Sequence, residues 1–135
     1  DIPPRSGLGS SSSSAVATVV ATALALGHKL SLDEVVELAM SAERLVHKNP
    51  SGVDVQVSVR GGLLLFKKGA QPQTLNLSKN VNFVVACTGI ERKTGDLIER
   101  VKVWREQNPS LFDSLVESST VMSQCCADAL CSSDL

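Results

Sequence analysis

The sequence predicts an α+β fold in which helices pack on one side of a mostly antiparallel sheet. Two segments with helical periodicity come first, short apolar runs typical of strands occupy the middle, and two further helical segments follow. The chain has 135 residues, of which 43% are hydrophobic and 20% charged, as in a folded domain or part of one. Aromatic residues make up 3%, with no tyrosine, so the core is expected to consist of Val, Leu, Ile and Ala.

A loop of glycines and hydroxyl residues precedes the first predicted helix. Residues 3–12 read Pro-Pro-Arg-Ser-Gly-Leu-Gly-Ser-Ser-Ser, and a core helix, apolar on nearly every side, is predicted from Ser10 to Leu26. The first N–H groups of a helix lack internal partners, and small loop residues let an anion approach them. The expected ligand is a phosphate, although a buried helix with a plain serine cap fits the same residues. The loop has neither the lysine of a Walker motif nor the third glycine of a dinucleotide fingerprint.

The second predicted helix carries an acidic residue on its apolar side. Ser31-Leu32-Asp33-Glu34 is a capping-box pattern that starts a helix reaching about His47. The apolar stripe consists of Leu32, Val35, Val36, Ala39 and Val46, and Glu43 lies on that stripe. A buried carboxylate needs a cation, a metal or hydrogen-bond donors, and Mg²⁺ bound to nucleotide phosphates is one such partner. The alternatives are a glutamate that reaches water from the helix end, or one that pairs with Arg44 or a distant lysine.

A second acidic residue of interest is Asp54. It follows the turn sequence Asn-Pro-Ser-Gly at residues 49–52 and lies near the start of the short segment Val53–Arg60. An aspartate fixed by such a turn could accept a proton from a substrate hydroxyl. Aspartate is also favoured as a helix cap, and the spacing alone leaves both interpretations open.

Three strands and two helices are predicted for the remainder of the chain. The strands are Leu63–Lys67, Gln73–Leu77 and Val81–Cys87, and the last shows the strongest strand pattern. The helices are Thr94–Gln107, with Leu97, Val101 and Trp104 on one side, and Leu111 to about Leu130, with an inner face of Leu111, Leu115, Met122, Cys126 and Ala129.

Charge and composition argue against several classes of partner. The net charge is −1 and no long basic run is present, which argues against nucleic acid. Residues 15–26 are too few to span a bilayer and no signal peptide is seen, so no membrane partner and a cytoplasmic location are expected. The four cysteines, Cys87, Cys125, Cys126 and Cys131, lack zinc-ligand spacing and are expected to be buried or half-buried thiols.

Taken together, the motifs resemble those of the GHMP kinase superfamily. Residues 3–11 are similar to its phosphate-binding motif Pro-x-x-x-Gly-Leu-Gly-Ser-Ser. Residues 42–54 resemble its Glu-Arg-x-x-His-Gly-Asn-Pro-Ser-Gly-Val-Asp block, with Lys48 in place of the glycine, and Gly61-Gly62 follows as in the family. Residues 88–94 look like its Thr-x-x-x-Arg-x-Thr segment. The Asn-Pro-Ser-Gly-Val-Asp run is most similar to the members that phosphorylate mevalonate.

The resemblance implies ATP-dependent phosphorylation of the C5 hydroxyl of mevalonate, a step of isoprenoid synthesis. The residues that would bind the ATP phosphates are Arg5, Ser6, Gly7, Leu8, Gly9, Ser10 and Ser11, with Arg5 in place of a small residue. Ser11 and Glu43 would bind Mg²⁺, and Asp54 would be the catalytic base. These roles account for a carboxylate on an apolar stripe and give Asp54 a function beyond capping.

The resemblance also implies that the chain is the middle part of a longer enzyme, with a fold similar to ribosomal protein S5 domain 2. Residues 1–90 would end the N-terminal ATP-binding domain, and residues 91–135 would lead into the C-terminal domain. The family's upstream lysine-bearing motif and downstream glycine-rich motif are not found, so the isolated chain is expected to have little or no activity. The resemblance is compatible with a homodimer of the full-length enzyme.

Two alternatives are left open by the sequence. One is another small-molecule kinase of the superfamily, such as phosphomevalonate kinase or galactokinase. The other is a non-catalytic module that keeps the fold and binds a partner or metabolite, although the presence of Ser11, Glu43 and Asp54 together speaks against it.

Overall fold

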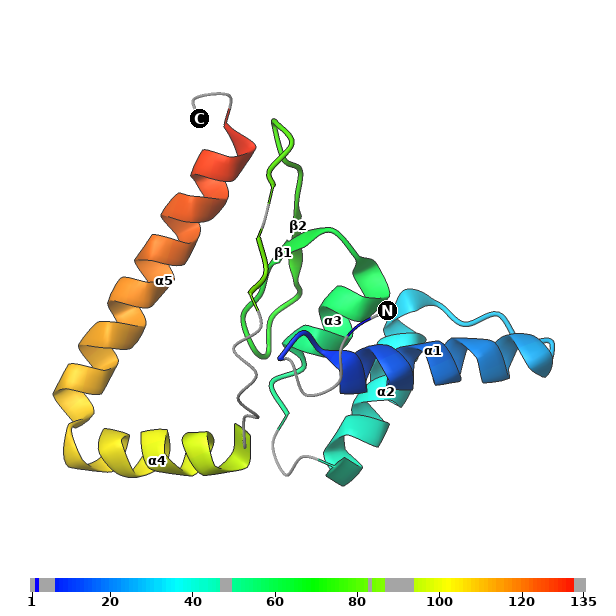
Figure 1. Ribbon diagram of the computed structural model, residues 1–135, viewed down its shortest axis with the longest axis horizontal. Helices are drawn as coiled ribbons and strands as arrows, with labels where there is room; N and C mark the ends of the chain where they lie inside the picture. Colours follow the sequence, from blue (N-terminus) through cyan, green and yellow to red (C-terminus); the bar gives the residue numbers. More distant parts are fainter. Residues whose placement is uncertain (1, 3–6, 47–49, 83, 87–93, 133–135) are drawn as a thin grey trace.

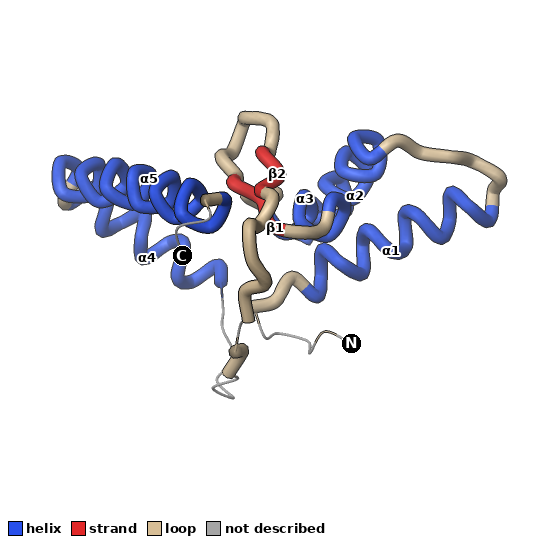
Figure 2. The backbone as a smooth tube through the Cα atoms, turned by 90° about the horizontal axis from the view of Figure 1, so that it is seen from above, coloured by secondary structure: helices blue, strands red, loops and turns tan. Residues whose placement is uncertain are grey.

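The computed structural model describes residues 2, 7–46, 50–82, 84–86 and 94–132 and is mostly helical. Its elements in chain order are α1 (Ser10–Ala25), α2 (Leu32–Val46), α3 (Val53–Arg60), β1 (Leu63–Leu65), β2 (Gln73–Leu75), α4 (Thr94–Gln107) and α5 (Pro109–Cys131). The helix and strand content is compatible with the predicted α+β class. The expected packing of all helices on one side of the sheet is not seen in the described part, because β1 and β2 lie between α1–α3 and α4–α5 (Figures 1 and 2).

The buried core lies where α1, α2 and α3 meet. It consists of Val16, Val35, Ala39 and Val55, each at most 8% exposed. Val35 and Ala39 belong to the predicted apolar stripe of α2, whereas Leu32 of that stripe is 54% exposed. The prediction that α1, apolar on nearly every side, packs inside a core is confirmed for one side of the helix only. Of its residues only Ser12 and Val16 are buried, because α2 and α3 cover one side of the helix.

The start of α2 is fixed by the predicted capping box. The backbone N–H and the hydroxyl of Ser31 each donate to Oε2 of Glu34 at 2.7 Å, and the N–H of Glu34 donates back to the Ser31 hydroxyl at 3.3 Å. Arg60 donates from Nη2 to Oδ1 of Asp33 and so ties the end of α3 to the start of α2. The predicted start of this helix is therefore confirmed together with its cause.

The strands form a short antiparallel hairpin. Leu63 lies opposite Leu75, and Leu65 lies opposite Gln73. These are two of the three predicted strands, each shorter than expected. The predicted strand Val81–Cys87 is wrong for residues 81, 82 and 84–86, which form no strand, and positions 83 and 87 lie outside the described residues. Val84 is 97% exposed. A strand needs a neighbouring strand for its hydrogen bonds. In the described segments the sheet consists of β1 and β2 alone, and neither pairs with this segment.

The helices α4 and α5 meet at a corner that begins with Asn108. Pro109 occupies the first turn of α5, where its missing N–H costs nothing. The Trp104 and Phe112 rings are 6.1 Å apart between centroids, and the Arg105 guanidinium lies 5.1 Å from the Phe112 centroid. These contacts fix the angle between the two helices locally.

The outer surface of α5 differs from the prediction. Leu111, Leu115 and Met122 of the expected inner face are 54%, 53% and 67% exposed, and Ala127 is the buried residue of this helix. Cys125, Cys126 and Cys131 are exposed free thiols, so the expected burial is wrong for them, and Cys87 lies outside the described residues. In the part of the chain that is described, no helix has both the length and the hydropathy to cross a bilayer.

Candidate functional site

The first turn of α1 starts from a glycine in a left-handed conformation. Gly9 is the N-cap with φ +72°, a backbone geometry that other residues adopt only under strain. Its carbonyl accepts 2.9 Å hydrogen bonds from both the N–H and the hydroxyl of Ser13. Because residue 9 has no side chain, it cannot cap the N–H groups of the first turn, which is the arrangement that favours an anion at a helix N-terminus.

Glu43 of α2 reaches this first turn. Its Oε1 accepts hydrogen bonds from the hydroxyls of Ser11 at 3.1 Å and Ser12 at 2.9 Å. Glu43 is 7% exposed, as its place on the apolar stripe predicted, and the two hydroxyl donors offset part of the cost of burying the carboxylate. Ser12 is 3% exposed, whereas Ser11 is exposed to solvent.

Asp54 approaches the same turn from α3. The N-cap of α3 is Gly52, so Asp54 is the second residue of the helix rather than its cap. A Cβ built on Gly9 would lie 3.5 Å from the Cβ of Asp54 and 3.8 Å from its Oδ1. Asp54 is exposed, and its carboxylate is therefore accessible from solvent beside the start of α1.

The structure thus brings Gly9, Ser11, Glu43 and Asp54 to one end of α1. Gly7 and Leu8 are exposed just before this end, while Arg5 and Ser6 lie outside the described residues. Carboxylate and hydroxyl oxygens are ligands that suit Mg²⁺, which commonly takes one or two protein oxygens and completes its shell with phosphates and water. In the described segments no group of three or more His, Cys, Asp or Glu residues could hold a metal.

Sequence reasoning missed two hydroxyl contacts at this site. The sequence motifs assign no role to Ser12, although its buried hydroxyl donates to Oε1 of Glu43. Ser13 and Ser58 place their hydroxyl oxygens 3.3 Å apart and connect α1 to α3. Ser12 could have been found from two features of the sequence. A buried Glu43 carboxylate needs hydrogen-bond donors, and successive serines stand at the start of α1.

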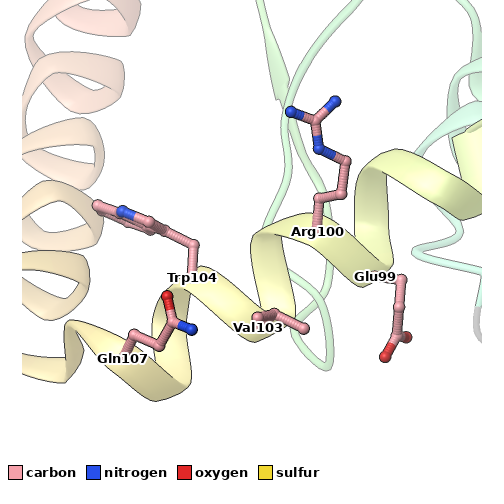
Figure 3. A pocket seen from close by; sticks show the side chains of 5 residues that line it. All are labelled: Glu99, Arg100, Val103, Trp104 and Gln107. Atoms are coloured by element: carbon pink, nitrogen blue, oxygen red, sulfur yellow. The ribbon is translucent and has the colours of Figure 1, made fainter.

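Two hollows lie elsewhere on the molecule. One of about 650 Å³ lies between the hairpin, Trp104 and α5, with Phe66, Leu115 and Gln124 in its lining. The other, of about 310 Å³, lies along α4, where Glu99 and Arg100 point apart and Trp104 reaches toward α5 (Figure 3). Neither is lined by the residues at the start of α1, and neither gathers a set of groups suited to chemistry.

Comparison with known proteins relates the chain to one group. Residues 1–62 match the family described as "GHMP kinases N terminal domain". The mevalonate kinase of Aeropyrum pernix is 41% identical over 120 residues, which cover 88% of this chain and 35% of that protein. The mevalonate kinases of Pyrococcus horikoshii and Saccharolobus solfataricus are 36% and 30% identical, over 87% and 86% of this chain and 34% and 37% of theirs. The chain therefore spans about a third of the length of the curated relatives it matches.

Proposed function

We propose that the chain is part of an ATP-dependent mevalonate kinase, because residues 1–62 match the family described as "GHMP kinases N terminal domain" and most of the chain is similar in sequence to mevalonate kinases. The reaction would transfer the γ-phosphoryl group of ATP to the C5 hydroxyl of mevalonate. The observation that carries the proposal is the meeting of the Ser11–Glu43 pair and Asp54 at the start of α1.

The loop Arg5–Ser11 is proposed to bind the ATP phosphates. Support comes from the uncapped first turn of α1 behind Gly9, where backbone N–H groups and the helix dipole favour negative charge. No acidic residue lies in the first turn of α1, so the helix itself places no competing carboxylate among these N–H groups. This loop would hold the phosphates through backbone donors, without the lysine that a Walker loop uses.

Ser11 and Glu43 are proposed to bind the Mg²⁺ that accompanies ATP. Their oxygens already meet at 3.1 Å, and Ser11 is an exposed residue of the first turn of α1, where the phosphates are expected. Magnesium bound there would supply charge neutralisation to the transferring phosphoryl group. Glu43 would be held ready for this role by hydroxyl donors of α1.

Asp54 is proposed to be the base that orients the mevalonate hydroxyl and accepts its proton. Its support is an exposed carboxylate beside Gly9, on a helix whose start is packed closely against α2. A Cβ built on Gly52 would lie 3.2 Å from Sδ of Met40, so the turn before Asp54 lies close against a side chain of α2. Fixed positioning is what phosphoryl transfer requires of a base.

Substrate choice in the full-length protein tests the proposal. ADP release is measured by a coupled assay with ATP, Mg²⁺ and one acceptor at a time: mevalonate, 5-phosphomevalonate or galactose. We expect ADP release that depends on mevalonate, with product identified as 5-phosphomevalonate by mass spectrometry. ADP release with one of the other acceptors instead would assign a different kinase, and nucleotide binding without turnover on any acceptor would favour a non-catalytic module.

A further inference from the structure

We propose that Ser12 is a positioning residue that holds the Glu43 carboxylate for metal binding, an inference that rests on the proposed function. Ser12 would not touch the nucleotide or the metal. It would act through its hydrogen bond to Oε1 of Glu43, which is 2.9 Å long and buried.

Four serines at the start of α1, Ser11 to Ser14, differ in the groups to which their hydroxyls donate. Ser13 and Ser14 donate to the carbonyls of Gly9 and Ser10 one turn earlier in the chain, as serines within helices ordinarily do. Ser11 and Ser12 instead donate across to Glu43 of α2. The hydroxyls of Ser11 and Ser12 therefore connect α1 to α2, while the Ser13 hydroxyl also lies 3.3 Å from that of Ser58 in α3.

Burial separates Ser11 from Ser12. Ser11 is exposed, so its oxygen can also face a ligand that arrives from solvent. Ser12 is 3% exposed, and its hydrogen bond to Oε1 of Glu43 is buried. When the Ser11 oxygen turns to a metal ion, Ser12 is the hydroxyl that continues to hold Oε1 of Glu43. Residues that orient a metal ligand in this way commonly change metal affinity by ten- to a hundredfold when they are removed.

The experiment compares Ser12→Ala with Ser13→Ala in the full-length protein. Both variants remove one hydroxyl from α1, and the Ser13 hydroxyl contacts Ser58 rather than Glu43. We expect Ser12→Ala to raise the Mg²⁺ concentration for half-maximal turnover about tenfold, while kcat at saturating Mg²⁺ stays within about twofold of the unaltered protein. Ser13→Ala is expected to leave the Mg²⁺ dependence unchanged.

A binding measurement supplies a readout independent of turnover. The rise in Tm on adding Mg²⁺ with a non-hydrolysable ATP analogue should need about tenfold more Mg²⁺ in Ser12→Ala. Ser12→Cys keeps a side chain of similar size with a weaker donor, and it should give an intermediate shift even if the alanine variant folds poorly. A general loss of packing would lower Tm without changing the Mg²⁺ requirement.

Glu43→Gln separates this inference from the proposed function. If Glu43→Gln abolishes turnover but Ser12→Ala and Ser13→Ala show the same Mg²⁺ dependence, Ser12 has no positioning role and the inference is overturned. If Glu43→Gln itself leaves turnover and Mg²⁺ dependence unchanged, the metal role of Glu43 is wrong and the inference is lost with it.

Discussion

Asp54 packs over the bare backbone of Gly9, so that a Cβ built on Gly9 would lie 3.5 Å from the Cβ of Asp54 and 3.6 Å from its Cγ. This contact connects the first turns of α1 and α3. It brings a residue from the glycine-rich loop and a residue from the Asn-Pro-Ser-Gly-Val-Asp run to one point, although their sequence motifs are far apart. The two motifs that define the resemblance therefore meet at the start of α1.

Replacement of Gly9 by Ala should destabilise the protein through its backbone. Gly9 has φ +72°, and a left-handed conformation costs a residue with a Cβ about 1–2 kcal/mol. The new methyl group would make only ordinary van der Waals contact with Asp54 at 3.5 Å, so little further strain is expected. Urea unfolding of the full-length protein measures the change in free energy of unfolding.

Gly27→Ala is the matched control for this change. Gly27 lies just beyond the other end of α1 with φ +74°, and nothing lies within 4 Å of a Cβ built there. Both variants should lose similar stability, but only Gly9→Ala should weaken ATP binding measured by calorimetry. Equal ATP affinity in the two variants would argue that the start of α1 does not hold the phosphates.

Replacement of Asp54 by Asn should remove the proposed base while keeping the size of the side chain. A positioned general base contributes about 10²- to 10⁴-fold, so kcat should fall within that range while ATP affinity changes little. Asp33→Asn is the control, because Asp33 is an exposed aspartate that pairs with Arg60 away from the start of α1. Coupled ADP release measures both, and a kcat for Asp54→Asn equal to that of the control would exclude the proposed role.

Local patterns in the sequence predicted those features whose causes are also local. The Ser31–Glu34 capping box follows from four consecutive residues, and the burial of Glu43 follows from its spacing to Ala39 on one helix. The position of Asp54 beside Gly9 depends on how α3 packs against α1, and nothing in the sequence spacing alone requires it. The serine run gave no indication of which hydroxyl would face Glu43, because that depends on how α1 rotates against α2.

The incorrect predictions concern elements whose partners are not specified by the local pattern. The apolar positions of α5 follow helical spacing, yet Leu115 and Met122 are exposed. Helical periodicity identifies the apolar face of a helix, but it does not say whether another segment covers that face. Residues 81–87 have strand composition, but strand formation depends on a neighbouring strand that must come from elsewhere. In both cases the local sequence indicates which secondary structure is favoured. Whether a helix face is buried, or a strand is paired, depends on segments far away in the sequence.

The capping box should make stability depend on acid pH. Hydrogen bonds from the backbone N–H of Ser31, and then from its hydroxyl, lower the pKa of Glu34 below its ordinary value of 4.5. The folded state therefore binds this proton less readily than the unfolded state. Its contribution is fully present above the unfolded pKa and is lost as pH falls through the lowered folded pKa.

Ser31→Ala should reduce this pH dependence. Unfolding free energies measured from roughly pH 7 to pH 3 should fall less steeply in the variant, because Glu34 then titrates nearer its ordinary range. Glu37→Gln is a control that removes an exposed carboxylate from the same helix and leaves the capping box in place. The variant keeps the Ser31 backbone N–H and removes only the hydroxyl. If stability falls with acid pH as steeply in Ser31→Ala as in the unaltered protein, the Ser31 hydroxyl does not contribute to the lowered pKa of Glu34.

Val55→Ala tests whether the contact of α1, α2 and α3 is the core that holds the site together. Val55 is 1% exposed and packs with Val16, Val35 and Ala39, so the loss of its two methyl groups should cost about 2 kcal/mol in transfer and cavity energy. Val57 on the same helix is 42% exposed, and Val57→Ala should cost about 0.5 kcal/mol or less. Because Asp54 precedes Val55 directly, Val55→Ala should also lower kcat, whereas Val57→Ala should not. Equal unfolding free energies for the two variants would contradict the placement of the core between these three helices.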